Sequence, residues 1–145
     1  MLSYEDLLDA YEWVSADLAL QNSAYVHRTS GAIYLDTDEI EVGEEVPEDI
    51  EDGTKYIAVP HKHDLDLGKA LVFDFVEEYL PEDVDKVAGY FKRPGAYSRY
   101  KELLERRELL EKWYGYEQKK TFEVLRQWAT ENSIPHQFKL DANAA

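Results

Sequence analysis

Beyond Pro60 the sequence is typical of helices almost to its end, whereas the runs that favour β-strands all precede this proline. Apolar residues after Pro60 recur at the three- and four-residue spacing of helices, and the strand-forming runs before it end at turn residues. Strands grouped in one part of a chain and helices in another are the pattern of an α+β fold. We therefore expect an N-terminal helix, a small antiparallel sheet of about three strands and a helical C-terminal half.

The N-terminal helix is predicted over residues 4–16. The side-chain oxygen of Ser3 can accept a hydrogen bond from the amide of residue 6, and the acidic residues Glu5 and Asp6 lie at the positive end of the helix dipole. The apolar residues that follow have helical spacing: Leu7, Leu8, Tyr11, Val14 and Leu18.

A hairpin and a third strand are predicted next. Residues 24–27 and 32–35 are β-prone and flank residues 28–31, which end in a glycine. Residues 56–60 suit a third strand, and Pro60 ends it because proline has no amide to donate to a sheet. Together these runs predict a small antiparallel sheet.

Acidic residues dominate the connection over residues 36–52. Because its few apolar residues are separated by charges, we expect a mobile loop with at most one edge strand near Ile40. Asp36, Asp38 and Glu41 have the alternate spacing with which oxygen-ligand metal sites begin, but no glycine follows where an EF-hand requires one. A solvated run of charge is the favoured interpretation.

Helices separated by proline and glycine are predicted in the second half. The clearest one has an apolar stripe from Leu67 to Tyr79, and Asp64 or Asp66 can cap its first turn. Pro81 ends this helix and suits the first turn of the next one. Further helices are expected over about residues 81–91, 97–104 and 109–132, with an interruption at residues 93–95.

A chain of 145 residues fits one domain that buries roughly two-thirds of its unfolded surface. We expect residues 1–134 to form a single α+β domain and residues 135–145 to form a polar tail. The sequence has no cysteine, which excludes disulfides, thiol nucleophiles and thiolate-held metals. The first residues lack the features of a signal peptide, and no apolar stretch approaches the roughly 20 residues of a membrane span, so we expect a cytoplasmic protein.

Charge is divided unevenly along the chain. Residues 1–91 carry 23 acidic and 5 basic residues (net -18), whereas residues 92–145 carry 8 acidic and 11 basic residues (net +3), for a total of -15. A protein this negative repels bulk nucleic acid unless its basic surface is well separated from its acidic one. The division therefore bears on partners and solubility more than on fold.

Four segments share a distinctive content of aromatic, glycine and basic residues. They are residues 25–31 (YVHRTSG), 95–101 (GAYSRYK), 113–116 (WYGY) and 126–129 (RQWA). In this order they span most of the chain and resemble uncharacterised protein family 0158, a bacterial family. Because that family has no assigned activity, the resemblance implies relatives but no catalytic residue, cofactor or partner.

The segment His61-Lys62-His63-Asp64-Leu65-Asp66 is the most enzyme-like part of the sequence. In an extended chain His61 and His63 share one face and can chelate zinc or nickel, but a catalytic metal site needs a third ligand and an open position. A polar loop with an aspartate cap explains the same residues, and we favour it. A metal-dependent enzyme that uses His61 and His63 is therefore an alternative hypothesis, and we expect no metal and no cofactor.

Basic and aromatic residues are interleaved between Lys92 and Arg126. Guanidinium groups pair with carboxylates or phosphates, and aromatic faces anchor protein partners or stack on bases. The same rings at helical spacing suit a helical core, and core packing is the favoured explanation for the set as a whole. As a function we predict a non-enzymatic protein-binding or regulatory module, with nucleic-acid binding through the same face as the alternative. The predicted contact residues are Arg93, Tyr97, Arg99, Tyr100, Trp113 and Tyr114.

Overall fold

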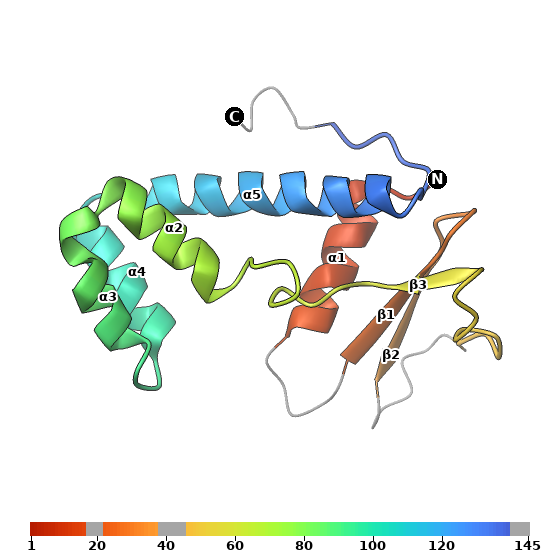
Figure 1. Ribbon diagram of the computed structural model, residues 1–145, viewed down its shortest axis with the longest axis horizontal. Helices are drawn as coiled ribbons and strands as arrows, with labels where there is room; N and C mark the ends of the chain where they lie inside the picture. Colours follow the sequence, from red (N-terminus) through yellow and green to blue (C-terminus); the bar gives the residue numbers. More distant parts are fainter. Residues whose placement is uncertain (17–21, 38–45, 140–145) are drawn as a thin grey trace. The chain divides into compact units, whose positions relative to one another are not determined.

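The computed structural model describes residues 1–16, 22–37 and 46–139, and this part of the chain divides into two compact units. Of the described residues, unit 1 contains those within 1–65 and 122–139, and unit 2 contains residues 66–121. The predicted α+β class is confirmed, since a helix and a three-stranded antiparallel sheet precede a helical C-terminal half (Figure 1).

Unit 1 begins with helix α1, Tyr4–Ser15, as the sequence predicts. The Oγ atom of Ser3 accepts a hydrogen bond from the amide of Asp6 at 3.1 Å and so caps the first turn. Leu7 and Ala10 are fully buried on one side of the helix. The cap and the apolar stripe together fix where α1 begins and which side it buries.

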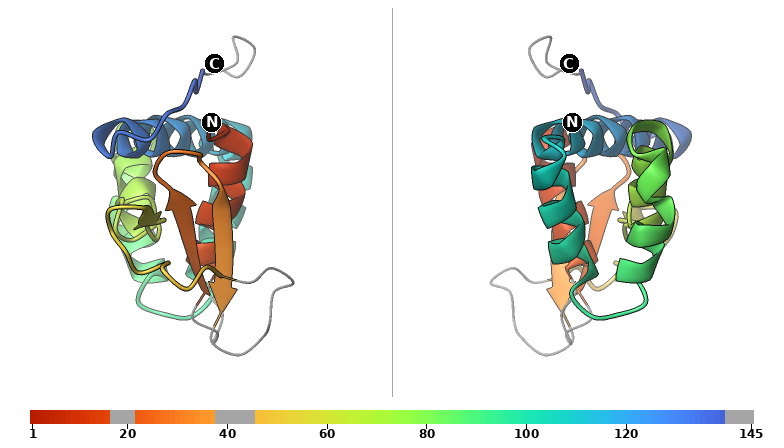
Figure 2. Two further views of the ribbon diagram at one scale, coloured as in Figure 1. Left: turned by 90° about the vertical axis from the view of Figure 1, so that its right-hand side faces the viewer. Right: turned by 90° about the vertical axis from the view of Figure 1, so that its left-hand side faces the viewer.

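The sheet of unit 1 has the strand order β2-β1-β3 within the described residues, and both pairings are antiparallel. Strand β1 is Asn22–His27, β2 is Ile33–Thr37 and β3 is Tyr56–Ala58. The buried residues of β1, Ala24 and Val26, lie on the side that packs against α1, which covers one face of the sheet (Figure 2). The Nε1 atom of Trp13 donates to the carbonyl oxygens of Ser23 and Asp36, at 2.9 and 3.3 Å, and ties α1 to β1 and β2.

The turn between β1 and β2 requires glycine at position 31. Gly31 has a φ of +77°, and a Cβ atom there would lie 2.5 Å from the backbone nitrogen of Leu2. The Nδ1 atom of His27 accepts hydrogen bonds from the amides of Thr29 and Ser30, at 3.3 and 3.1 Å. The turn is therefore held by its own side chains and packs closely against the N-terminal segment.

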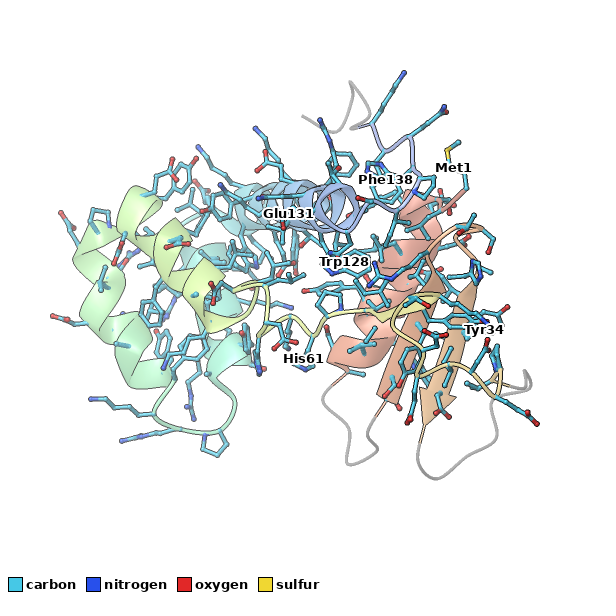
Figure 3. The ribbon with its side chains drawn as sticks, turned by 45° about the vertical axis from the view of Figure 1, so that its right-hand side comes forward. Met1, Tyr34, His61, Trp128, Glu131 and Phe138 are labelled. Carbon is cyan, nitrogen blue, oxygen red and sulfur yellow. The ribbon has the colours of Figure 1, made fainter. Side chains whose placement is uncertain are left out.

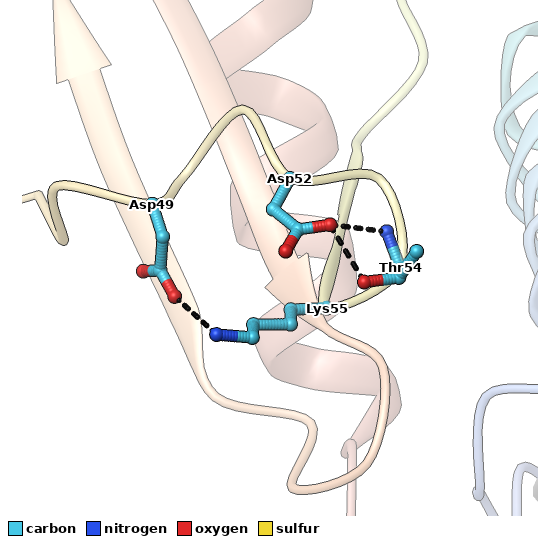
Figure 4. A network of polar contacts seen from close by, with 4 residues as sticks. All are labelled: Asp49, Asp52, Thr54 and Lys55. Carbon is cyan, nitrogen blue, oxygen red and sulfur yellow. Dashed lines mark hydrogen bonds and ion pairs between the residues drawn. The ribbon is translucent and has the colours of Figure 1, made fainter.

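Residues 46–55 form a series of turns, which overlap the end of the loop predicted over residues 36–52. Asp49 pairs with the Nζ atom of Lys55 at 2.9 Å, and the Oδ1 atom of Asp52 accepts hydrogen bonds from the amide and hydroxyl of Thr54 (Figure 4). Because short polar side chains satisfy the backbone locally, such a segment can be ordered without a core of its own. The predicted edge strand near Ile40 lies outside the described residues.

The C-terminal segment after residue 131 packs on unit 1. The sequence predicts a polar tail from residue 135, yet Phe138 is 7% exposed and its ring lies 5.6 Å from that of Tyr4 (Figure 3). A parallel bridge joins Leu2 to His136, and Ile134 is buried. Ile134 and Phe138 therefore belong to the core of unit 1.

Within the described residues of unit 2, helices are the regular secondary structure, and short turns connect them. It contains α2 (Lys69–Tyr79), the 3-10 helix η1 (Pro81–Asp83), α3 (Val84–Tyr90), α4 (Ala96–Arg106) and the first half of α5 (Leu110–Glu131). The positions predicted from apolar spacing and from the breaks at Pro81 and at residues 93–95 are confirmed.

The predicted aspartate cap of α2 is wrong. Gly68 occupies the N-cap position and no side chain bonds the first turn. The Oδ2 atom of Asp64 instead accepts a hydrogen bond from the amide of His61 at 3.1 Å, and Asp66 has a φ of +55°. The Asp64 carboxylate therefore stabilises the turn at residues 61–64 and not the start of α2, because Asp bonds readily to nearby backbone amides.

Candidate partner-binding site

The turn between α3 and α4 brings the predicted basic residues to one end of unit 2. Gly95 has a φ of +81° at the N-cap of α4, so the chain reverses there at little cost. The Nη1 atom of Arg99 donates to the carbonyl oxygen of Pro94 at 3.2 Å, which holds its guanidinium group on the turn. Arg93 lies on the same turn and is exposed.

Three aromatic rings pack in a row at this turn: one from α2, one from the turn itself and one from α4. The ring of Tyr97 meets that of Phe91 edge-on at 5.2 Å, and Phe91 lies 5.8 Å from Phe73 of α2. The Nζ atom of Lys69 lies 5.6 Å from the ring of Phe91. Partial burial, with a smaller effect from Glu117, raises the pKa of the Tyr97 hydroxyl, although the residue is 41% exposed. A rigid aromatic base with an exposed ring is the usual form of an interface anchor.

We name this surface the α3–α4 corner. Its cationic residues are all exposed, and none of them forms an ion pair within the described residues. By contrast, Arg107 bonds the buried carboxylate of Asp83 with its Nε atom, at 3.3 Å. The corner therefore has cationic groups that no ion pair within the described residues neutralises. Its members are Lys69, Phe91, Lys92, Arg93, Tyr97 and Arg99.

Two of the predicted contact residues lie in the core of unit 2. Trp113 is 2% exposed and Tyr100 is 0% exposed, and their rings meet edge-on at 5.1 Å. The ring of Phe75 lies 5.3 Å from that of Trp113. Burial, followed by Glu117, raises the pKa of the Tyr100 hydroxyl, which has no hydrogen-bond partner within the described residues. Tyr100 and Trp113, which the sequence analysis predicts as contact residues, therefore belong to the core. Helical spacing alone does not distinguish a core position from a surface position.

Tyr114 is partly exposed, and its described contact is with the Nζ atom of Lys101, 5.8 Å from the ring. Within the described residues, no hydrogen bond, ion pair or ring contact joins Tyr114 to Arg93, Tyr97 or Arg99. The corner therefore takes three of the six predicted residues, and Tyr114 lies on a separate part of the α4 and α5 surface.

Lys69 and Phe91 belong to the corner, but the sequence analysis does not identify them as contact residues. Lys69 lies in the first turn of α2, far along the chain from the predicted basic stretch. Lys69 and Phe73 are four residues apart, which places both on one side of a helix; this spacing is the sequence feature from which their contact could be predicted. Phe91 follows the end of α3 and has no such signal, because its role depends on the fold of the α3–α4 turn.

The two histidines of the alternative hypothesis lie close together in unit 1. The rings of His61 and His63 are 4.5 Å apart, and the Nδ1 atom of His61 accepts a hydrogen bond from the amide of His63 at 3.1 Å. That bond occupies the Nδ1 atom of His61. Within residues 1–16, 22–37 and 46–139, no group of three potential ligands is close enough to hold a metal ion.

The net charges of the two units differ from those of the sequence segments 1–91 and 92–145. Unit 1, residues 1–65 and 122–140, has 18 acidic and 5 basic residues, a net charge of -13. Residues 66–121 have 12 acidic and 11 basic residues, a net charge of -1. The exposed cations of the α3–α4 corner therefore belong to a nearly neutral unit, and most of the net negative charge of the chain belongs to unit 1.

The fold and the corner define an α+β protein with a helical unit that presents a basic and aromatic surface. The chain belongs to the uncharacterised protein family UPF0158, whose family model matches residues 1–145. This confirms the predicted resemblance. Comparison with curated proteins and with solved structures gave no match. Among the described residues, no helix has both the length and the apolar character needed to cross a bilayer.

Proposed function

We propose that the chain is a non-enzymatic protein-binding module that holds an acidic segment of a partner protein on the α3–α4 corner. One observation carries this proposal: the exposed cations of the corner have no ion pair within the described residues, and the same turn and helix start present an exposed tyrosine whose ring packs against Phe91. The absence of cysteine fits a partner in a reducing compartment such as the bacterial cytoplasm.

The chemistry of the corner suits carboxylates. Arginine presents a planar fork of donors that binds a carboxylate through two parallel hydrogen bonds. The guanidinium of Arg99 is already held by the carbonyl oxygen of Pro94, so less side-chain entropy is lost when it binds. Tyr97 adds an aromatic ring that is 41% exposed.

Nucleic acid is the second candidate partner, because arginine also binds phosphate and an exposed ring can stack on a base. The total charge of -15 opposes it, since a long polyanion would approach the acidic unit as well as the corner. A short acidic peptide avoids most of this repulsion, which is why we favour a protein partner.

Titration of the full chain with two labelled probes tests the proposal. One probe is a peptide of glutamates and leucines, and the other is a single-stranded RNA of similar length; binding is followed by fluorescence anisotropy at several salt concentrations. We expect the peptide to bind, and the double variant Arg93→Ala, Arg99→Ala to weaken it about tenfold or more. The matched control, Lys86→Ala with Lys119→Ala, removes the same charge from other exposed positions of unit 2 and should change affinity less than about twofold.

The control pair distinguishes a site from diffuse attraction. If both double variants weaken the peptide equally, general charge explains the binding and the proposal is wrong. Tighter binding of RNA, with an affinity that falls steeply as salt rises, would replace the protein partner by a nucleic acid. Circular dichroism of each variant checks that unit 2 remains folded.

A further inference from the structure

The sheet of unit 1 has a second face, opposite α1, that is rich in aromatic side chains. Successive side chains of a strand point to opposite faces, so burial of Ala24 and Val26 against α1 places Tyr25 and His27 on the other side. Cross-strand partners share a face, and Tyr34 of β2 is paired with Tyr25. We name this surface the tyrosine face. Its members are Tyr25, His27, Tyr34, Tyr56 and Ala58.

The rings of this face contact one another and leave one part accessible. The ring of Tyr56 lies edge-on to that of His27, at 5.1 Å, and to that of Tyr34, at 5.9 Å. Tyr56 is 9% exposed, whereas Tyr25 and Tyr34 are partly exposed. Ala58, the β3 partner of Tyr25, is exposed, so this small side chain does not cover the tyrosine. The Tyr25 and Tyr34 rings therefore form the accessible part of the face, and Figure 3 shows Tyr34 at the strand β2.

The charge around the tyrosine face is negative. The segment 46–55, which connects to β3, contributes the exposed acids Glu48 and Glu51. Of the bases beside the sheet, Lys55 pairs with Asp49, and Arg28 keeps its charge while it donates to the carbonyl oxygen of Gly53 at 2.8 Å. The unit as a whole has a net charge of -13. A partner for this face must therefore be cationic.

We propose that the tyrosine face binds a lysine- and arginine-rich segment of a protein. Cationic side chains are attracted to the faces of tyrosine rings, and the negative field of unit 1 raises the local concentration of a basic chain. Carboxylates at the margin, such as Glu48 and Glu51, can pair with further basic residues of the segment. This surface differs from the α3–α4 corner in its unit, its elements and the sign of its charge, so neither proposal depends on the other.

The test uses the full chain and a fluorescent dodecapeptide of alternating arginine, lysine and glycine. We expect saturable binding, and we expect the amide NMR signals of β1 and β2 to shift most on addition of the peptide. The double variant Tyr25→Leu, Tyr34→Leu keeps apolar volume but removes both rings, and it should weaken binding about tenfold or more. The variant Tyr25→Phe, Tyr34→Phe retains the rings and should bind within about twofold of the parent.

Two controls separate the face from general charge and from the corner. Asp9→Asn with Glu12→Gln removes two exposed acids of α1, on the covered side of the sheet, and should change affinity less than about twofold. Tyr97→Leu alters the corner alone and should leave the basic peptide bound.

Three outcomes would overturn the proposal. The first is an affinity that the paired leucine substitutions leave unchanged while the α1 control lowers it. The second is a set of NMR shifts that avoids β1 and β2, which decides the matter even where the leucine variant does not fold. The third is concentration-dependent self-association that the leucine substitutions abolish, which would make the face a contact between two copies of the chain.

Discussion

Replacement of Trp113 by alanine should unfold unit 2 far more readily than replacement of an exposed tyrosine. Trp113 is 2% exposed, and its ring lies 5.3 Å from that of Phe75 and 5.1 Å from that of Tyr100. Deletion of a buried tryptophan side chain costs about 3–5 kcal/mol, since it removes apolar contacts and leaves a cavity. A typical domain has a free energy of unfolding of about 5–15 kcal/mol, so this loss is a large share of it.

Tyr97→Ala is the matched comparison, because Tyr97 is 41% exposed and has one ring contact among the described residues, with Phe91. It should lower the free energy of unfolding by about 1 kcal/mol. Urea denaturation followed by far-ultraviolet circular dichroism measures both variants, and the helical signal reports mainly on unit 2 and α5. A loss below about 1.5 kcal/mol for Trp113→Ala, or equal losses for the two variants, would refute the assignment of Trp113 to the core and Tyr97 to the surface.

Three further predictions concern the turns, the core and pH. Gly31→Ala should lower the free energy of unfolding by at least about 2 kcal/mol, because residue 31 has a positive φ and an added Cβ would clash with the backbone of Leu2. Gly95→Ala should lower it by about 1 kcal/mol, because residue 95 has a positive φ but open space around it. Thermal unfolding of the two variants compares these losses. Tyr100→Phe should leave the free energy of unfolding unchanged or raise it by up to about 1 kcal/mol, because the buried hydroxyl has no partner within the described residues, and a measured loss above about 1 kcal/mol would contradict this. NMR titration should find the pKa of Asp49 below its usual value because of the hydrogen bond from Lys55, and Lys55→Gln should raise it. Since the folded pKa is the lower one, this pair stabilises the fold above about pH 4 and loses its effect as the pH falls through the folded value.

Local patterns in the sequence predict most of the fold. The Ser3 cap, the glycine-closed hairpin and the stripe from Leu67 to Tyr79 each depend on neighbours a few residues away, and these short-range preferences agree with the final structure. The wrong cap predicted for α2 shows the limit of this reasoning. The sequence allows the Asp64 carboxylate to bond either a helix amide or an amide of its own turn, and in the structure it bonds the amide of His61. The burial of Phe138 depends on Tyr4, at the other end of the chain, and no local pattern reports such a contact.

The candidate site could be predicted only in part, for the same reason. Basic residues on a turn are exposed in almost any fold, so Arg93 and Arg99 were identifiable from composition and from the break at Pro94. Aromatic residues at helical spacing fit a core and a surface equally well, and only the packing of α2 against α4 and α5 separates Trp113 from Tyr97. The tyrosine face requires the strand register, which pairs Tyr25 with Tyr34 across a turn.

Photo-crosslinking in living cells tests the proposed binding function most directly. A benzophenone amino acid replaces Tyr97 in the α3–α4 corner or, as a control, the exposed Glu82 before α3. We predict a protein adduct at position 97 that resists nuclease, is lost when Arg93 and Arg99 are changed to glutamate, and does not form at position 82. The account is contradicted if position 97 gives no adduct, if nuclease removes the adduct, or if the two charge reversals leave it intact.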